Sequence, residues 1–287
     1  MRLKKLYTMK PIITATELSE IFNQENLVIL DARTGIDARE NYLQNHIKGA
    51  RFIDLDKDLA EIGEDAAFGG RHPLPKISKF AETLQKLGIS EDSHIVVYDT
   101  SNGANAAARC WWMLKSFGVE KVQVLSGGFQ TAEKAGIPLK SGEEIFEKTS
   151  FILKENWSWP ISTLEEVEKE ISENSAIVID VRDAYRYRGE SEPIDLVAGH
   201  IPGAINIPFS ENLDENGEFL SPEILKEKYQ DLLAEKPDKL IIHCGSGVTA
   251  CHTILALDYA GFPIPNLYVG SWSEWSRREG KEIAREV

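Results

Sequence analysis

One cysteine stands in the stretch of this sequence whose residue types are best suited to chemistry. Cys244 opens the octapeptide Cys-Gly-Ser-Gly-Val-Thr-Ala-Cys, which directly follows the apolar run Leu240–His243. The run predicts a short buried strand, and the apolar spacing over residues 250–260 predicts a helix. Glycines let the loop between them turn tightly, and the first N–H groups of a helix lack partners, so the loop can surround an anion with donors. A thiolate at its centre would be a nucleophile.

Two chemistries use a cysteine at the head of an anion-binding loop, and a buried structural cysteine is the alternative to both. A phosphatase loop needs an arginine six residues after the cysteine to bind the phosphoryl oxygens. That position is Ala250, and Cys251, His252 and Thr253 follow it, so no arginine is available. The short ring of residues 244–249 is better matched to one sulfur atom than to a tetrahedral phosphate. The sequence therefore argues against a phosphatase.

The loop resembles the active-site loop of the two-domain rhodanese-like sulfurtransferases, and it is more similar to the 3-mercaptopyruvate form than to the thiosulfate form. The resemblance extends from about Ile13 to about Arg278. It implies that Cys244 carries the transferred sulfur as a persulfide, without a metal or an organic cofactor. Backbone N–H groups of the next five residues would stabilise that persulfide as an oxyanion hole does. These residues are Gly245, Ser246, Gly247, Val248 and Thr249.

Length, charge and cysteine content limit the remaining possibilities. A chain of 287 residues suits two ordinary α/β domains. Its net charge of −14 argues against nucleic-acid or anionic-membrane partners. No run approaches the roughly 18 apolar residues of a membrane span. Residues 1–10 are basic, but no apolar run follows them, so a secretory signal is not expected. Three cysteines favour a reducing compartment, the cytoplasm, over a disulfide framework.

An internal repeat organises the chain. Leu27–Asp31 and residues 176–180 are both apolar runs that end in the phrase Asp-x-Arg. The phrase His-Ile-x-Gly-Ala then follows at His46 and again at His200, where it predicts a turn held by a histidine hydrogen bond. A repeat of about 150 residues is too long for a solenoid and predicts two copies of one domain.

The repeat and the alternation of patterns predict the fold class. Strands alternate with helical segments such as residues 76–87 and 105–117, which indicates an α/β fold. We expect two tandem rhodanese-like domains, each with a mostly parallel sheet flanked by helices. The expected boundaries are 11–140 for the N-terminal domain, 141–160 for the linker and 161–287 for the C-terminal domain.

The repeat also separates structural features from candidates for function. Arg33 and Arg182 both follow a strand aspartate, so we expect ion pairs that stabilise the fold. Cys244 occurs in the second copy only, and its counterpart in the first copy is Asp99. A carboxylate cannot carry a sulfur atom, so we expect a catalytically silent N-terminal domain and a catalytic C-terminal domain.

The resemblance also implies residues that bind the sulfur donor. In the family, an arginine four residues after the Asp-x-Arg arginine binds the anionic donor, and here that residue is Arg186, with Arg188 as a second candidate. Mercaptopyruvate enzymes carry a further arginine before the His-Ile-Pro-Gly phrase, but residues 189–199 contain none. Arg188 or Arg71 could replace it. The donor therefore stays open between 3-mercaptopyruvate and thiosulfate.

A proton relay is implied by the same resemblance. Ser246 occupies the position where thiosulfate-specific relatives carry a lysine. In mercaptopyruvate-specific relatives the serine is proposed to act with a histidine and an aspartate from the first domain. The matching residues are His72 and Asp56, which would reach the loop if the site lies between the domains, where pockets are common. The alternative for His72 is an ordinary histidine in a surface loop.

These observations predict a sulfurtransferase. It would move a sulfane sulfur from 3-mercaptopyruvate or thiosulfate to a thiol, cyanide or thioredoxin-like acceptor through a Cys244 persulfide. The alternative is a sulfur-carrier or regulatory rhodanese module that acts on a protein partner, and the intact Cys244 and Arg186 favour the enzyme. Cys110 and Cys251 are expected to be core residues, with a redox role of Cys251 left open.

Overall fold

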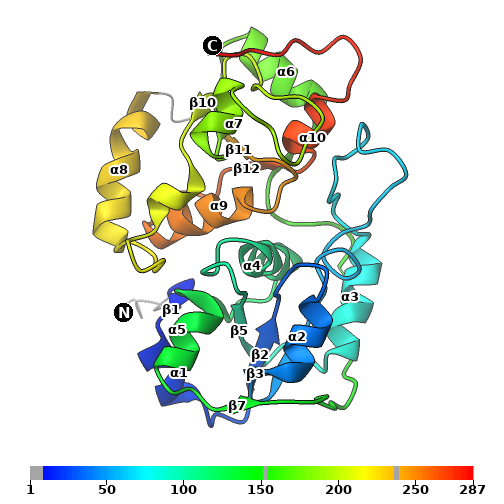
Figure 1. Cartoon of the computed structure of the whole chain (residues 1–287), viewed down its shortest axis with the longest axis vertical. Helices are drawn as coiled ribbons and strands as arrows, with labels where there is room; N and C mark the ends of the chain where they lie inside the picture. Colours follow the sequence, from blue (N-terminus) through cyan, green and yellow to red (C-terminus); the bar gives the residue numbers. More distant parts are fainter. Residues whose placement is uncertain (1–8, 151–153, 236–238, 287) are drawn as a thin grey trace, which may run out of the picture.

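The chain folds into two α/β halves, each built around a five-stranded sheet (Figure 1). The structure is a computed structural model and describes residues 9–150, 154–235 and 239–286. Most of the basic N-terminal stretch, residues 1–8, therefore lies outside the described residues. Within the described ranges, no helix is long and apolar enough to cross a membrane. The predicted fold class, with a parallel sheet in each half, is confirmed.

The first sheet has the strand order β1-β6-β5-β2-β4, and all neighbouring pairs are parallel. Its strands are β1 (Ile12–Ile13), β2 (Leu27–Asp31), β4 (Ala50–Phe52), β5 (His94–Tyr98) and β6 (Val122–Leu125). The helices of this half are α1 (Ala15–Ile21), α2 (Ala38–Gln44), α3 (Ile77–Lys86), α4 (Ala106–Phe117) and α5 (Gly128–Lys134). A small antiparallel pair joins β3 (His46–Ile47) to β7 (Leu139–Lys140). The central strands are mostly apolar, as is typical of a parallel sheet whose two faces are covered by helices.

The second sheet repeats this plan with the order β10-β9-β11-β12-β8, again parallel. Its strands are β8 (Ile161–Ser162), β9 (Ile177–Asp180), β10 (Ile205–Asn206), β11 (Leu240–His243) and β12 (Asn266–Tyr268). Its helices are α6 (Leu164–Ser172), α7 (Ala184–Arg188), α8 (Pro222–Glu235), α9 (Ala250–Tyr259), α10 (Ser271–Trp275) and a 3₁₀ turn, η1 (Phe209–Asn212). The central pair β9 and β11 thus matches β2 and β5 of the first sheet.

The repeated Asp-x-Arg phrase forms the same ion pair in both halves. Arg33 Nη2 lies 2.6 Å from Asp31 Oδ2, and Arg182 Nη2 lies 2.6 Å from Asp180 Oδ2. All four side chains are almost completely buried, so each charge is neutralised by its partner where water cannot screen it. The predicted structural role of these two arginines is confirmed.

The other repeated features also match between the halves. His46 Nδ1 lies 2.7 Å from a backbone carbonyl oxygen, and His200 Nδ1 lies 2.8 Å from one, which confirms the predicted turn hydrogen bonds. Helices α1 and α6 both begin with a capping box, at Thr14 and Thr163. In each, the threonine hydroxyl accepts a hydrogen bond from the backbone N–H of the glutamate three residues later, and that glutamate's carboxylate accepts one from the threonine N–H. The duplication therefore extends to the ends of the helices.

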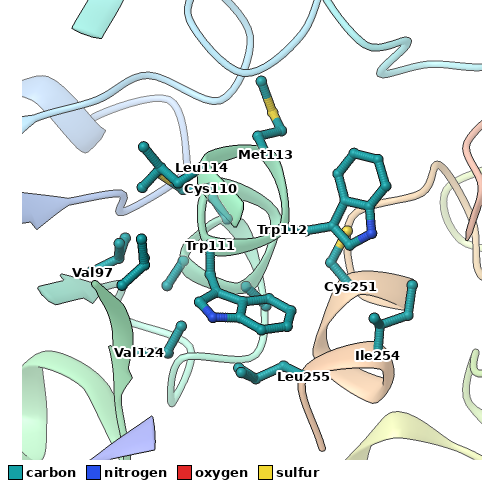
Figure 2. Packing of buried hydrophobic residues seen from close by; sticks show 14 of the residues in the cluster. Val97, Cys110, Trp111, Trp112, Met113, Leu114, Val124, Cys251, Ile254 and Leu255 are labelled. Carbon is teal, nitrogen blue, oxygen red and sulfur yellow. The ribbon is translucent and has the colours of Figure 1, made fainter. Parts of the chain in front are cut away.

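The two halves share one continuous apolar core. Helix α4 of the first half packs against α9 of the second, and Figure 2 shows Trp111 and Trp112 of α4 facing the apolar side chains of α9. Among the latter are Cys251, Ile254 and Leu255, all completely buried. Because α9 begins where the Cys244 loop ends, this packing fixes the loop at the boundary between the halves (Figure 1).

The described parts of the predicted linker, residues 141–150 and 154–160, lie along the first half. The ring centroid of Trp159 lies 5.2 Å from that of Trp111 and 6.0 Å from that of Trp112. Ser158 donates its backbone N–H to the carbonyl of Ser116 at the end of α4. The described part of this segment is therefore anchored to the same helix that forms the boundary.

Candidate active site

The Cys244 loop leaves the end of β11 and enters α9, as the sequence predicted. Its first two carbonyl groups are held by the neighbouring helix α10. The backbone N–H of Trp272 donates to the carbonyl of Cys244 at 3.0 Å, and that of Ser273 donates to the carbonyl of Gly245 at 2.9 Å. Since its carbonyls bond to α10, the loop has a defined orientation.

The backbone N–H groups of the loop are unpaired. Those of residues 245–249 donate to no oxygen or nitrogen atom within the part of the chain that the structure describes. Gly247 makes the curl possible, since its φ is +73° and a Cβ there would lie 2.6 Å from the carbonyl oxygen of Val269. A curled loop of free donors at the start of a helix binds anions.

The corresponding loop of the first half already contains an anion. Asp99 follows β5 as Cys244 follows β11, and its carboxylate is completely buried. It accepts four backbone hydrogen bonds of 2.8 to 3.1 Å, from Ser101, Gly103, Asn105 and Ala107. The first half therefore fills its own loop with a side chain, whereas the shorter cysteine of the second half leaves that loop open.

A cavity of about 200 Å³ opens above Cys244. The first half lines it with Leu55, Arg71, His72 and Asn105, and the second half with Arg186, Ile194 and the Cys244 loop. A larger cavity of about 380 Å³ lies near Phe262 and Pro263, but no cysteine, serine, threonine or histidine lines it. Chemistry is therefore expected in the smaller cavity, which neither half could form alone.

Ser246, His72 and Asp56 lie in a chain of contacts across the boundary. Ser246 Oγ is 2.7 Å from His72 Nδ1, and His72 Nε2 is 3.3 Å from Asp56 Oδ1. Burial, assisted by the charge of Arg71, lowers the pKa of His72 to about 4, so the ring is neutral at pH 7. With its proton on Nε2 toward the aspartate, Nδ1 can accept the serine hydroxyl proton.

Arg186 lies at the cavity wall, held by two carboxylates. Its Nη2 is 2.7 Å from Glu192 Oε1 and 3.4 Å from Asp195 Oδ2. Burial alone would lower the pKa of Arg186, but the hydrogen bonds and charges of the two carboxylates raise it. The arginine that the sequence assigned to donor binding is thus charged and oriented beside Cys244.

Arg71 is the second arginine that lines the cavity. The sequence analysis considered it only as a replacement for the arginine that residues 189–199 lack. It reaches across from the first half to Asp195, with its Nε 3.0 Å from Oδ1. Arg277 lies 3.0 Å from the same oxygen. The side chain of Asp195 is completely buried, and it pairs with three arginines, of which Arg186 is the third. Nothing in the sequence pattern pointed to Asp195.

Arg188 is not brought to the site, which corrects one expectation from the sequence. It lies at the end of α7, its side chain is 41% exposed, and it pairs with Glu190 at 2.6 Å. It does not line the cavity. Arg188 follows Arg186 by two positions, and on a helix side chains two positions apart do not share a face.

The remaining cysteines lie in the core. Cys251 and Cys110 are completely buried on α9 and α4, and burial raises the pKa of the Cys251 thiol to about 12. The Cys251 thiol donates to the carbonyl of Gly247 at 3.3 Å. Both thiols are therefore protonated at neutral pH, and the three cysteines are free of disulfides.

Arg109 on α4 is a site residue that sequence reasoning missed. It is completely buried and donates to the carbonyl oxygens of Gly247 at 3.1 Å and His72 at 3.0 Å. Burial lowers its pKa, and the described residues place no carboxylate beside it. Its signal in the sequence was an arginine inside an otherwise apolar helix, residues 106–114.

Comparisons with known proteins agree with this geometry. The family model described as a rhodanese-like domain matches residues 14–135 and 163–278. A Pseudomonas aeruginosa protein named probable 3-mercaptopyruvate sulfurtransferase is 41% identical over 95% of this chain and 97% of its own. A Rattus norvegicus protein named thiosulfate sulfurtransferase is 37% identical over 85% of this chain and 82% of its own. The crystal structure of SseA from Escherichia coli, a 3-mercaptopyruvate sulfotransferase by its title, superimposes with a TM-score of 0.75 at 32% identity over 93% of this chain and 100% of its own.

Proposed function

The chain belongs to the rhodanese-like family and is a sulfurtransferase, and from that premise we propose that it transfers sulfur through a persulfide on Cys244. One observation carries the proposal: two equivalent loops, of which one encloses the Asp99 carboxylate and the other leaves its N–H groups free around a thiol. A persulfide anion on Cys244 would occupy the place that a carboxylate occupies in the first half. The N-terminal domain would then be catalytically silent in the sense that its own loop carries no sulfur.

In the first step, the Cys244 thiolate attacks the outer sulfur of a small anionic donor. With 3-mercaptopyruvate, an S–S bond forms and the C–S bond of the donor breaks, so pyruvate enolate leaves and takes up a proton. With thiosulfate, the S–S bond of the donor breaks and sulfite leaves. The N–H groups of residues 245–249 stabilise the charge on the persulfide sulfur because they are already oriented for it.

The contact between Ser246 and His72 supports a proton path for a thiol donor. The neutral ring accepts the hydroxyl proton at Nδ1 while Asp56 keeps the other ring proton in place. The serine oxygen is then able to accept the donor thiol proton. Thiosulfate carries no such proton, so this path serves mercaptopyruvate and not thiosulfate.

In the second step, the persulfide gives its outer sulfur to an acceptor. A thiolate attacks that sulfur, the Cys244 thiolate leaves, and the acceptor becomes a persulfide. Cyanide or a thioredoxin-like dithiol would act in the same way, the latter by releasing the sulfur as sulfide and forming its own disulfide. Three free cysteines support a reducing compartment, the cytoplasm, as the place of action.

The test is to load the protein with each donor and measure its intact mass before and after adding cyanide. Wild-type protein should gain the mass of one sulfur atom and lose it to cyanide as thiocyanate. Cys244→Ser should gain none, since a hydroxyl cannot hold the sulfur, while Cys110→Ser serves as a matched control that loads normally. If neither small donor were turned over while Cys244 still accepted sulfur from a protein persulfide, the result would instead support a carrier that acts on a protein partner.

A further inference from the structure

Ser271, the first residue of α10, lies next to the nucleophile in a backbone conformation that serine rarely adopts. Its φ is +55°, and in the part of the chain that the structure describes the only other non-glycine residues with a positive φ are Asn102 and Asn174. Asparagine enters the left-handed region more readily than other residues, whereas the Cβ of serine is strained there. Ser271 is also completely buried, so contacts within the protein hold it in this conformation.

The internal repeat shows that the fold does not need a serine at this position. Gly128 lies three residues after the end of β6, as Ser271 lies three residues after the end of β12. The φ of Gly128 is +62°, so both halves place a left-handed residue here, and glycine adopts that conformation without strain. The second half therefore carries a strained serine where the first half carries an unstrained glycine.

The hydroxyl of Ser271 is bonded to the backbone of the nucleophile. Its Oγ accepts the N–H of Cys244 at 3.1 Å and donates to the carbonyl of Tyr268 at 2.8 Å. A hydroxyl has one proton, and since that proton goes to Tyr268, a lone pair is left to face the N–H of Cys244. The N–H of Trp272 donates to the carbonyl of Cys244 at 3.0 Å, so α10 holds the peptide groups on both sides of the Cys244 Cα.

These hydrogen bonds fix the direction of the Cys244 side chain. Peptide groups are planar, so holding the two that flank a Cα also fixes the direction in which its Cβ projects. The N–H of Cys244 is used by Ser271, whereas the N–H groups of residues 245–249 stay free within the described part of the chain. A reacting atom that is misplaced by about 1 Å can lose about 100-fold in rate. The orientation of Cys244 therefore matters for its chemistry.

We propose that Ser271 is a positioning residue for sulfur transfer. Its hydroxyl fixes the backbone of Cys244 so that the sulfur faces the free N–H groups of the loop, and the left-handed conformation is what brings the hydroxyl to Cys244. Ser271 does not line the cavity, so this role is the same for every sulfur donor. The inference rests on the proposed persulfide function of Cys244.

The experiment compares wild type with Ser271→Ala and Ser271→Gly. Both variants lose the hydroxyl, but only glycine relieves the strain, so Ser271→Gly should unfold at a higher urea concentration than Ser271→Ala. Loading of Cys244 with sulfur from thiosulfate in a single turnover, read by intact mass after rapid acid quenching, should be slower by about 10- to 100-fold in both variants alike. The thiosulfate concentration that gives half the maximal loading rate should change by less than about threefold, because the cavity wall is untouched.

Ser276→Ala is the matched control. Ser276 lies directly after α10, and its Oγ donates to the carbonyl of Trp272 at 2.7 Å. This variant also loses a serine hydroxyl and its hydrogen bond, but Ser276 neither contacts Cys244 nor lines the cavity. It should load with sulfur at the wild-type rate.

Two results would overturn the inference. One is an unchanged loading rate in both Ser271 variants; the other is a rate that follows stability, with glycine restored toward wild type and alanine slow. If Ser271→Ala does not fold, Ser271→Gly decides alone, since the first half shows that glycine suits this backbone: a slow rate supports the role and a wild-type rate refutes it. Failure of wild-type Cys244 to gain sulfur from either small donor or from a protein persulfide would refute the proposed function itself, which distinguishes the two failures.

Discussion

The guanidinium of Arg109 donates to the carbonyl of Gly247 at 3.1 Å, although the arginine belongs to the first half and the glycine to the second. The same group donates to the carbonyl of His72 at 3.0 Å. One buried side chain thus holds both the curl of the Cys244 loop and the residue that contacts Ser246. The geometry of the site depends on this bridge between the halves.

Replacing Arg109 with Met should therefore disturb both stability and turnover. The carbonyls of Gly247 and His72 would lose their donor, and unsatisfied buried acceptors cost about 1–3 kcal/mol each. We expect the free energy of unfolding in urea to fall by at least about 2 kcal/mol, and kcat to fall with both donors. Arg109→Lys, whose ammonium can reach only one of the carbonyls, should have a free energy of unfolding and a kcat between those of wild type and Arg109→Met. A Met variant as stable and active as wild type would contradict the bridge.

His72 should make stability depend on pH. Burial and the charge of Arg71 lower its pKa from 6.5 to about 4, while in the unfolded chain it titrates near 6.5. Between these values the unfolded state binds a proton that the folded state does not, so stability is full above pH 6.5 and falls as the pH drops toward 4. Wild type should lose about 3 kcal/mol more than His72→Gln across this window, measured by urea unfolding. Equal losses would mean that His72 titrates normally.

Asp195 should influence the choice of sulfur donor, because its carboxylate pairs with Arg71 and Arg186 at the cavity. Asp195→Asn removes one negative charge from beside Arg71 and Arg186, which leaves a larger positive excess. The ratio of kcat/KM for mercaptopyruvate to that for thiosulfate should then fall by about tenfold, because the dianion gains more from an added positive charge. Steady-state kinetics with both donors give the ratio. A rise in the ratio would refute the charge argument.

Cys251 should be chemically silent in the folded protein. Burial raises the pKa of its thiol to about 12, so native protein treated with iodoacetamide at neutral pH should be alkylated at Cys244 and not at Cys251. Cys251→Ala should keep most of the wild-type turnover and lose about 1 kcal/mol of stability through the small cavity it leaves. Peptide mass mapping and cyanide turnover provide the measurements. Loss of sulfur loading in this variant would point to a redox role.

Asp99 should act on stability alone. An amide offers one acceptor oxygen where the carboxylate offers two, and its NH₂ group would face the backbone N–H groups of residues 105 and 107. Asp99→Asn should lower the free energy of unfolding by about 2 kcal/mol while kcat per folded molecule stays unchanged. Urea unfolding and active-site titration of Cys244 separate the two quantities. A drop in kcat at full Cys244 occupancy would contradict the silent first half.

Much of the molecule could be predicted because the determining signals are local. The apolar runs that end in Asp-x-Arg, the repeated histidine phrase and the glycines after Cys244 each act within a few residues. They set strand ends, turns and an anion-binding loop regardless of what lies elsewhere. The expectation for Arg188 failed because it lies two positions after Arg186 on α7, so that Arg186 is buried while Arg188 is exposed. The residue types of α7 did not indicate which of its faces would be buried.

By itself, the sequence determined two α/β halves, a nucleophilic cysteine at the start of α9 and the absence of a phosphatase arginine. Tertiary structure alone decided what surrounds that cysteine. The packing of α4 on α9 brings Arg71, His72 and Arg109 to the loop from more than 130 positions away in the chain. Such contacts depend on the docking of two independently patterned surfaces, and no periodicity or motif in the sequence encodes the distance between them.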